Sequence, residues 1–190
     1  MNLEHREIPQ ALHNEEGDGE LHSHCRVCDC YLLEDETEYY LEKVVRRVPE
    51  LQTQQTLFEF AVCANCLQEL RKALSKESKR AMEQFFQQKM QAVFFNQPHT
   101  NLYEAFENGR CLFTGKKTDE FETFQMAAYC KGRHLHSQQP PIIISDETIE
   151  ESTELLSAQT RDELNNFVNS NFGWPPEFAK LLTDGDLALL

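Results

Sequence analysis

Two pairs of cysteines with identical spacing constrain this chain more than any other feature. Cys25 and Cys28 form one Cys-x2-Cys pair, Cys63 and Cys66 form the other, and 34 residues separate the pairs. Two thiolates three residues apart in a tight turn can point at one centre, so two such turns supply four sulfur ligands in a tetrahedron. The pattern therefore predicts a four-cysteine metal site, and Zn²⁺ is the ion that this ligand set suits best.

Other ligands and another metal stay open at this point. Iron in a four-thiolate site uses the same ligands, so the residues alone do not separate it from zinc. His22, His24 and Cys30 lie in the same nine-residue stretch as the first pair, and each could replace a ligand. Because four cysteines already complete a tetrahedron, we expect these three residues to be neighbours of the site, for example donors to a ligand sulfur.

The residues between the two pairs have the pattern of a β-hairpin. Residues 37–48 are rich in Tyr and Val, residues 56–62 alternate between two faces, and a polar loop after Pro49 joins them. A hairpin returns the chain to where it began, which brings the second cysteine pair back to the first. That pair then opens a long helix, predicted over 64–94 by apolar residues at helical spacing and by the absence of Pro and Gly.

A knuckle (CRVC), a hairpin and a helix with the second pair (CANC) in its first turn together resemble the treble-clef class of zinc fingers. The resemblance covers about residues 24–80. It implies a structural zinc ion and no particular activity. The predicted fold class is α+β: a treble-clef-like zinc knuckle, a β-hairpin and a long helix, followed by a second β-hairpin plus helices.

The second half of the chain repeats this order of elements. The sequence predicts, in turn, a short helix at 100–109, strands at 120–130 and 140–145, a helix at 146–156 and a last helix from about 160 to 169. Cys111, Thr114 and Gly115 have the outline of a knuckle whose second cysteine has become threonine. We hypothesise that this half is a degenerate copy of the first unit that has lost its metal.

A rival interpretation makes the second half a metal site of its own. Its ligands would be Cys111, Cys130, His134 and His136. His134 and His136 would point to the same face of a strand, which permits ligation. Nothing in the spacing requires it, and Cys130 reads equally well as a core residue.

Composition and charge suggest how the chain is organised. We expect a flexible acidic segment at 1–21, the zinc unit at 22–97, the second unit at 98–183 and a tail at 184–190. The net charge is −14, and no apolar run approaches the length of a membrane span. Residues 1–10 also lack the apolar core of a secretion signal, so we expect a cytoplasmic protein.

Several functions fit poorly with these residues. Four thiolates leave no open position on the metal for a substrate or a water, and no nucleotide-binding or metalloprotease motif is present, so we expect no enzyme activity. We instead expect a protein-interaction or scaffold module with an unidentified protein partner. The acidic C-terminal helices and residues 173–178 are candidates for the partner surface, although Trp174 could equally fill a core position.

Nucleic-acid binding is the alternative function. Basic residues gather on one face of the predicted 64–94 helix and on the hairpin; they are Lys72, Lys76, Lys79, Arg80, Arg46 and Arg47. Such a stripe could contact phosphates. The net charge of −14 disfavours this function, because the whole molecule repels a polyanion at long range.

Overall fold

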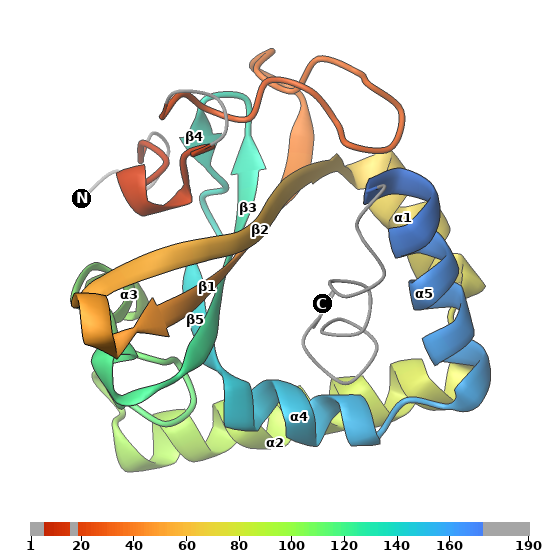
Figure 1. The fold of residues 1–190 in the computed structure, drawn as a ribbon. Helices are drawn as coiled ribbons and strands as arrows, with labels where there is room; N and C mark the ends of the chain where they lie inside the picture. The colour runs from red at the N-terminus through yellow and green to blue at the C-terminus, as the bar shows by residue number, and fades with distance from the viewer. Residues whose placement is uncertain (1–5, 16–18, 173–190) are drawn as a thin grey trace. The chain divides into compact units, whose positions relative to one another are not determined.

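The structure is a computed structural model that describes residues 6–15 and 19–172 (Figure 1). The strands are β1 (Glu38–Val48), β2 (Thr53–Cys63), β3 (Thr123–Lys131), β4 (His134–Leu135) and β5 (Ile142–Ser145). The helices are α1 (Ala64–Ala73), α2 (Lys76–Asn96), α3 (Leu102–Glu107), α4 (Asp146–Glu154) and α5 (Ala158–Phe172). The predicted α+β class is confirmed. Residues 173–178 and the tail at 184–190 lie outside the described residues.

The chain divides into two compact units, and each unit is made of two separate segments. Met1–Leu67 and Asn101–Ser145 form the first unit, and Gln68–Thr100 and Asp146–Leu190 form the second. Each half of the sequence therefore contributes to both units, whereas the sequence suggested consecutive units at 22–97 and 98–183. No helix within the described residues is both long enough and apolar enough to cross a bilayer.

The first unit contains an antiparallel sheet in which β1 lies between β2 and β3 (Figure 1). The sheet order is β2-β1-β3-β4, and β5 also pairs with β3. The two hairpins that the sequence predicts are therefore parts of one sheet, because β1 uses its second edge to pair with β3. The register places Tyr39 opposite Cys63 on one side and Cys130 on the other.

The first hairpin is tighter than the sequence suggests. The 3-10 turn Pro49–Leu51 is followed by Gln52 in the left-handed conformation, with φ 50°, and β2 begins at once at Thr53. The polar residues before position 56, predicted as loop, therefore pair with the end of β1. The hairpin runs back to Cys63, the last residue of β2, as expected.

The described N-terminal residues pack against this sheet, in contrast to the flexible segment suggested by their composition. Ile8 and Leu12 are buried, Leu12 completely. The carbonyl of Arg6 accepts a hydrogen bond from the Leu135 N–H at 2.8 Å, and its guanidinium lies 4.0 Å from the ring centre of Tyr103. Two buried apolar side chains and a backbone hydrogen bond hold these residues against the sheet, although their composition is acidic.

Two adjacent charged residues in the middle of β1 are buried on opposite faces of the sheet, because side chains alternate along a strand. Lys43 is 2% exposed, and its Nζ lies 3.0 Å from Glu59 Oε2 on β2 and 2.9 Å from Glu15 Oε1. Glu59 is the residue paired with Lys43 in the β1–β2 register. Glu42 is fully buried, and its Oε2 accepts a hydrogen bond from the Tyr40 hydroxyl at 3.0 Å.

The prediction of a single helix over 64–94 is wrong. The structure ends α1 at Ala73 and begins α2 at Lys76, with Ser75 as the N-cap between them. The Ser75 hydroxyl accepts a hydrogen bond from the Ser78 N–H at 3.1 Å. Such a side-chain acceptor satisfies an N–H group that has no partner in the first turn of a helix, so a serine can start a new helix without Gly or Pro.

The N-termini of α2 and α5 cap each other in the second unit. The Ser75 N–H donates to Thr160 Oγ1 at 3.0 Å, and the Ser157 N–H donates to Ser78 Oγ at 2.8 Å. Ser157 Oγ also accepts a hydrogen bond from the Thr160 N–H, as Ser75 does from Ser78. Each helix thus supplies a hydroxyl that satisfies a backbone donor at the start of the other.

Candidate metal centre

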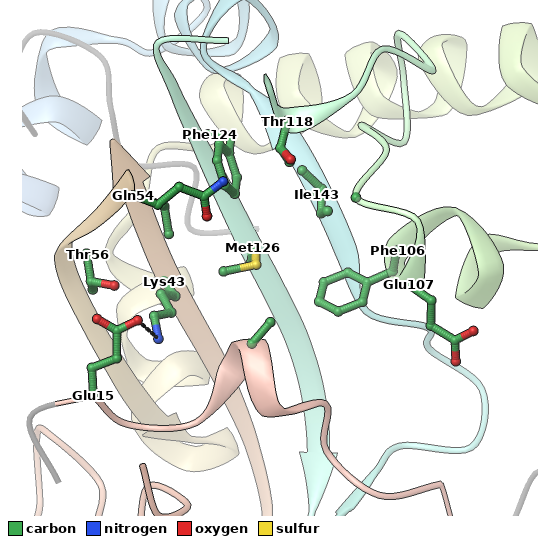
Figure 2. A pocket seen from close by; sticks show the side chains of 13 residues that line it. Glu15, Lys43, Gln54, Thr56, Phe106, Glu107, Thr118, Phe124, Met126 and Ile143 are labelled. Atoms are coloured by element: carbon green, nitrogen blue, oxygen red, sulfur yellow. Dashed lines mark ion pairs between the residues drawn. The ribbon is translucent and has the colours of Figure 1, made fainter. Parts of the chain in front are cut away.

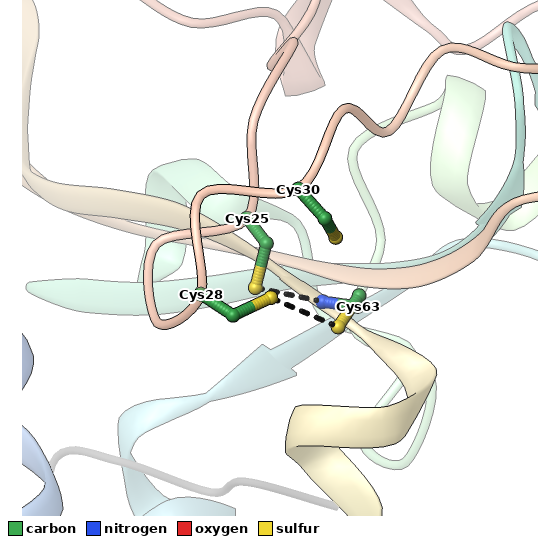
Figure 3. Close-up of side chains that lie close together, drawn as sticks. All are labelled: Cys25, Cys28, Cys30 and Cys63. Carbon is green, nitrogen blue, oxygen red and sulfur yellow. Dashed lines mark hydrogen bonds between the residues drawn. The ribbon is translucent and has the colours of Figure 1, made fainter.

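Four cysteine sulfurs converge in the first unit, and every pair of them lies within 4.8 Å (Figure 3). Cys25, Cys28 and Cys30 come from the turn before β1, and Cys63 is the last residue of β2. The hairpin brings these two segments together, as the sequence predicts. Among the described residues this is the group of side chains suited to hold a metal ion.

The turn at residues 25–30 is fixed by its backbone. The Cys25 N–H donates to the Cys30 carbonyl and the Asp29 N–H donates to the Cys25 carbonyl, both at 2.9 Å. Asp29 has a left-handed φ of 58°, a conformation that Asp tolerates better than most residues. The Arg26 N–H donates to the Ala61 carbonyl at 2.8 Å, which ties the turn to the end of β2.

One sulfur–sulfur distance in this group equals the edge of a tetrahedral metal site. A zinc–sulfur bond of about 2.3 Å gives a sulfur–sulfur edge of about 3.8 Å in a regular tetrahedron. The Cys28 and Cys63 sulfurs lie 3.7 Å apart. The Cys63 N–H donates to Cys25 Sγ at 3.3 Å, and the Cys25 sulfur also accepts backbone hydrogen bonds from Val27 and Cys28. Backbone N–H donors around a sulfur stabilise the thiolate that a metal requires.

Cys66 makes a fifth thiol at this centre. It lies in the first turn of α1, and its thiol hydrogen-bonds with Cys28 and Cys63. The Cys30 thiol hydrogen-bonds with the same two residues. Cys25, Cys28 and Cys63 are therefore accompanied by two candidates for a fourth ligand: Cys66, which the sequence predicts, and Cys30, which the sequence suggests is only a neighbour.

The thiols differ in how readily they ionise. The backbone N–H of Cys30 donates to the Cys28 sulfur and lowers the pKa of Cys28 to about 7. Burial raises the pKa of Cys25, raises that of Cys66, and raises that of Cys30 to about 12. The Cys28 thiol is therefore partly ionised near neutral pH before a metal binds. Binding of a divalent ion would displace the protons of the other ligand thiols.

The two histidines of this stretch lie outside the sulfur group. His22 is 8% exposed, burial lowers the pKa of its ring, and its Nε2 has no hydrogen-bond partner among the described residues. The His24 ring packs edge-on against Tyr31 with centres 5.5 Å apart, and its Nδ1 is 2.9 Å from Ser23 Oγ. Neither ring joins the group of possible metal ligands.

The rival second metal site does not assemble within the described residues. Cys111, Cys130, His134 and His136 do not form a group with ligand atoms close enough for one ion. Cys130 is completely buried and hydrogen-bonds with Tyr39, which fits a core residue. All seven cysteines are free thiols in the structure.

A small pocket on the Lys43 face of the sheet is a separate candidate site (Figure 2). Its volume is about 270 Å³, and side chains such as Phe106, Met126 and Ile143 form an apolar wall. Glu15 and Lys43 lie on its polar side and are paired with each other. Because Lys43 already contacts Glu15, Glu59 and the His13 carbonyl, this wall offers a ligand no uncommitted cation.

Two lysines of the predicted basic stripe have partners within α1. Lys72 Nζ lies 2.8 Å from Glu69 Oε1, and Lys79 Nζ donates to the Arg71 carbonyl at 3.0 Å. These contacts reduce the number of charges that the stripe offers to phosphates.

Comparison with protein-family models, with curated proteins and with solved structures finds no match to this chain. The arrangement of the five thiols is therefore the best guide to function.

Proposed function

We propose that this chain is a zinc-binding protein whose metal ion is structural, and that it serves as a protein-interaction or scaffold module. The observation that carries the proposal is the convergence of Cys25, Cys28, Cys30 and Cys63 within 4.8 Å, with Cys66 in contact with two of them. A knuckle, a hairpin and the start of a helix supply these sulfurs, which is the arrangement of a treble-clef-like zinc unit. Free thiols persist in a reducing compartment, so the proposal includes a cytoplasmic location.

The structural role follows from the ligand count. Zinc with four thiolates has no open position for water or substrate, so it can crosslink the turn and the end of β2 without taking part in a reaction. Burying Cys25 and Cys63 beside each other as thiolates without a cation would be costly, and a divalent ion removes that cost. The metal therefore stabilises the fold from which a partner surface is presented.

Metal analysis of the purified chain tests this proposal. We expect one zinc per wild-type chain, with loss of both the metal and cooperative unfolding in Cys63→Ser. Cys130→Ala is the matched control, because it removes a buried thiol outside the centre and should retain the metal. Iron in place of zinc would appear as visible thiolate-to-iron absorption. A wild-type chain purified without chelators that contains neither metal would contradict the proposal.

The interaction role rests on exposed apolar side chains in the second unit. Phe95 at the end of α2 is 88% exposed and its neighbour Phe94 is 45% exposed. Large exposed apolar residues of this kind are frequent in protein-binding surfaces. A photo-crosslinking amino acid at position 95 should capture one discrete protein in cells, whereas the same group at the exposed position of Gln84 should not. Equal products at the two positions would argue against a specific surface.

A further inference from the structure

The turn that holds the first cysteine pair has a counterpart in the second half of the chain. Both turns have a hydrogen bond from the first residue's N–H to the sixth carbonyl and one from the fifth N–H to the first carbonyl. The bonds are Cys25 N to Cys30 O and Asp29 N to Cys25 O in one turn, and Cys111 N to Lys116 O and Gly115 N to Cys111 O in the other, all 2.9 Å. The fifth residue is left-handed in both, with φ 58° at Asp29 and 69° at Gly115.

Each turn is attached in the same way to the strand that precedes a helix. The second residue of the first turn, Arg26, donates to the carbonyl of Ala61, and the second residue of the other turn, Leu112, donates to the carbonyl of Ile143, both at 2.8 Å. Each acceptor lies two residues before the end of its strand, at Cys63 in β2 and at Ser145 in β5. A helix begins at the next residue in both halves, α1 in one and α4 in the other.

The equivalence continues along the chain into the second helix of each half. Ser75 lies 12 residues after Cys63, and Ser157 lies 12 residues after Ser145. Each serine accepts a hydrogen bond from the N–H three residues later and, through its carbonyl, from the N–H four residues later. In the mutual capping of α2 and α5, Ser75 and Ser157 each donate the backbone N–H to a hydroxyl of the other helix. Two related copies would make such a reciprocal contact.

The pairing of β1 with β3 is also the one expected if the two halves are equivalent. These two strands occupy equivalent positions in the two halves, and they pair with each other in antiparallel register from Glu38↔Lys131 to Arg46↔Thr123. Two copies related by a twofold axis must meet in this way, with the same edge of each strand in contact. A chance similarity between two unrelated hairpins would not require their first strands to be partners.

We propose that the two halves are copies of one metal-binding unit and that only the first copy has kept its ligands. This inference rests on the proposed zinc function. Matching the turns and the strand ends places Cys25, Cys28, Cys63 and Cys66 on Cys111, Thr114, Ser145 and Thr148. The second set holds one thiol and three hydroxyls. Ser and Thr are close to Cys in size, but neutral hydroxyls do not replace thiolates as ligands for zinc.

The comparison also assigns the fourth ligand. The position of Cys66 is matched by Thr148, which is 1% exposed and small, whereas the position of Cys30 is matched by Lys116, an exposed side chain that no tetrahedral sulfur site contains. The metal ligands are therefore Cys25, Cys28, Cys63 and Cys66. Cys30 is an additional thiol next to the centre.

Restoring thiols to the second copy tests the inference. Thr114→Cys/Ser145→Cys/Thr148→Cys, together with the native Cys111, should raise bound zinc from one to two ions per chain. Co²⁺ should give two equivalents of tetrahedral thiolate spectrum in the same protein. The matched control carries Thr114→Cys, Ser145→Cys and Lys116→Cys, which copies the Cys30 position instead, and should remain at one tightly bound ion.

A second measurement keeps the test decisive if the triple variant fails to fold. In the otherwise natural chain, Cys66→Ser should weaken zinc binding by more than the 10–100-fold that follows loss of an outer hydrogen-bond partner, and Cys30→Ser should stay within about that range. Equal losses in the two variants, or one zinc in a folded triple variant, would overturn the inference while the zinc function stands. A wild-type chain without metal would instead refute the zinc function itself.

Discussion

Glu42 provides the sharpest test of the energetics of this fold. Its carboxyl is fully buried in the middle of β1, with Phe60 and Ala127 as its neighbours on the adjoining strands. The Tyr40 hydroxyl donates to Oε2 at 3.0 Å, and Oε1 has no hydrogen-bond partner among the described residues. Burial raises the pKa of Glu42 to about 8, from an ordinary value of 4.5.

The raised pKa makes the folded state less stable as pH increases. Below pH 4.5 the carboxyl is protonated in both states and contributes no pH dependence. Between 4.5 and about 8 the unfolded chain releases this proton while the folded chain retains it, so the free energy of unfolding falls by about 1.4 kcal/mol per pH unit. By pH 7 the accumulated loss is about 3 kcal/mol.

The neutral variant Glu42→Gln should therefore be more stable than wild type by about 3 kcal/mol at pH 7. The difference should shrink below about 1 kcal/mol at pH 5, because glutamine has no proton to release. Urea unfolding at pH 5, 6, 7 and 8 measures both free energies, and Glu50→Gln, at an exposed position of the hairpin turn, is the control. A difference that is constant with pH, or that grows towards acid, would refute the assignment of a buried neutral carboxyl.

Three further predictions concern the rest of the chain. Lys43→Met leaves Glu59 buried without its cation and should cost about 3–5 kcal/mol in the free energy of unfolding, most of it recovered in Lys43→Met/Glu59→Leu; no recovery would contradict the ion-pair account. Ser78→Ala should cost about 1–2 kcal/mol in the free energy of unfolding because it removes the acceptor for the Ser157 N–H. The double variant Ser78→Ala/Thr160→Val should cost less than the sum of the two single variants, as urea unfolding would show. Removal of zinc by a strong chelator should lower the melting temperature of wild type and of Cys130→Ala, and should not change the thermal scan of Cys63→Ser, which already lacks the metal and cooperative unfolding. Equal changes in wild type and Cys63→Ser would place the metal elsewhere.

The parts of this fold that could be predicted from the sequence are those set by local patterns. The Cys-x2-Cys spacing predicts the turn that holds Cys25 and Cys28. Richness in Tyr and Val predicts the first strand of the first hairpin, and the alternation between two faces predicts the second. The start of a helix after Cys63 follows from the end of that alternation. Each of these signals depends on residues that are close together in the chain.

The parts that could not be predicted depend on distant partners. Nothing near β1 indicates that its second edge pairs with β3, and Lys43 appears exposed until Glu15 and Glu59 are placed beside it. The break at Ser75 did have a local signal, since Ser75 and Ser78 have capping spacing, but the apolar periodicity of 64–94 masked it. The Ser75 N–H also bonds to Thr160, a partner 85 residues away that no local window contains.

The choice of the fourth sulfur ligand of the metal centre also cannot be made from local sequence patterns. Spacing alone selects Cys66, whereas proximity in the structure adds Cys30 to the group. Tetrahedral counting does not choose between them, because both thiols contact Cys28 and Cys63. Only the match to the second half of the chain, between turns 86 residues apart, separates the two.

The position of β1 between two strands has a consequence during synthesis. β2 is complete soon after β1, but β3 ends at Lys131, some 80 residues beyond the end of β1, which is about 4–17 s at ordinary translation rates. Throughout that interval β1 presents an open edge to every other nascent chain. The two charges at its centre, Glu42 and Lys43, then make this edge a poor partner for a foreign strand. Residues that are costly to bury in the finished protein thus protect the unfinished one from aggregation.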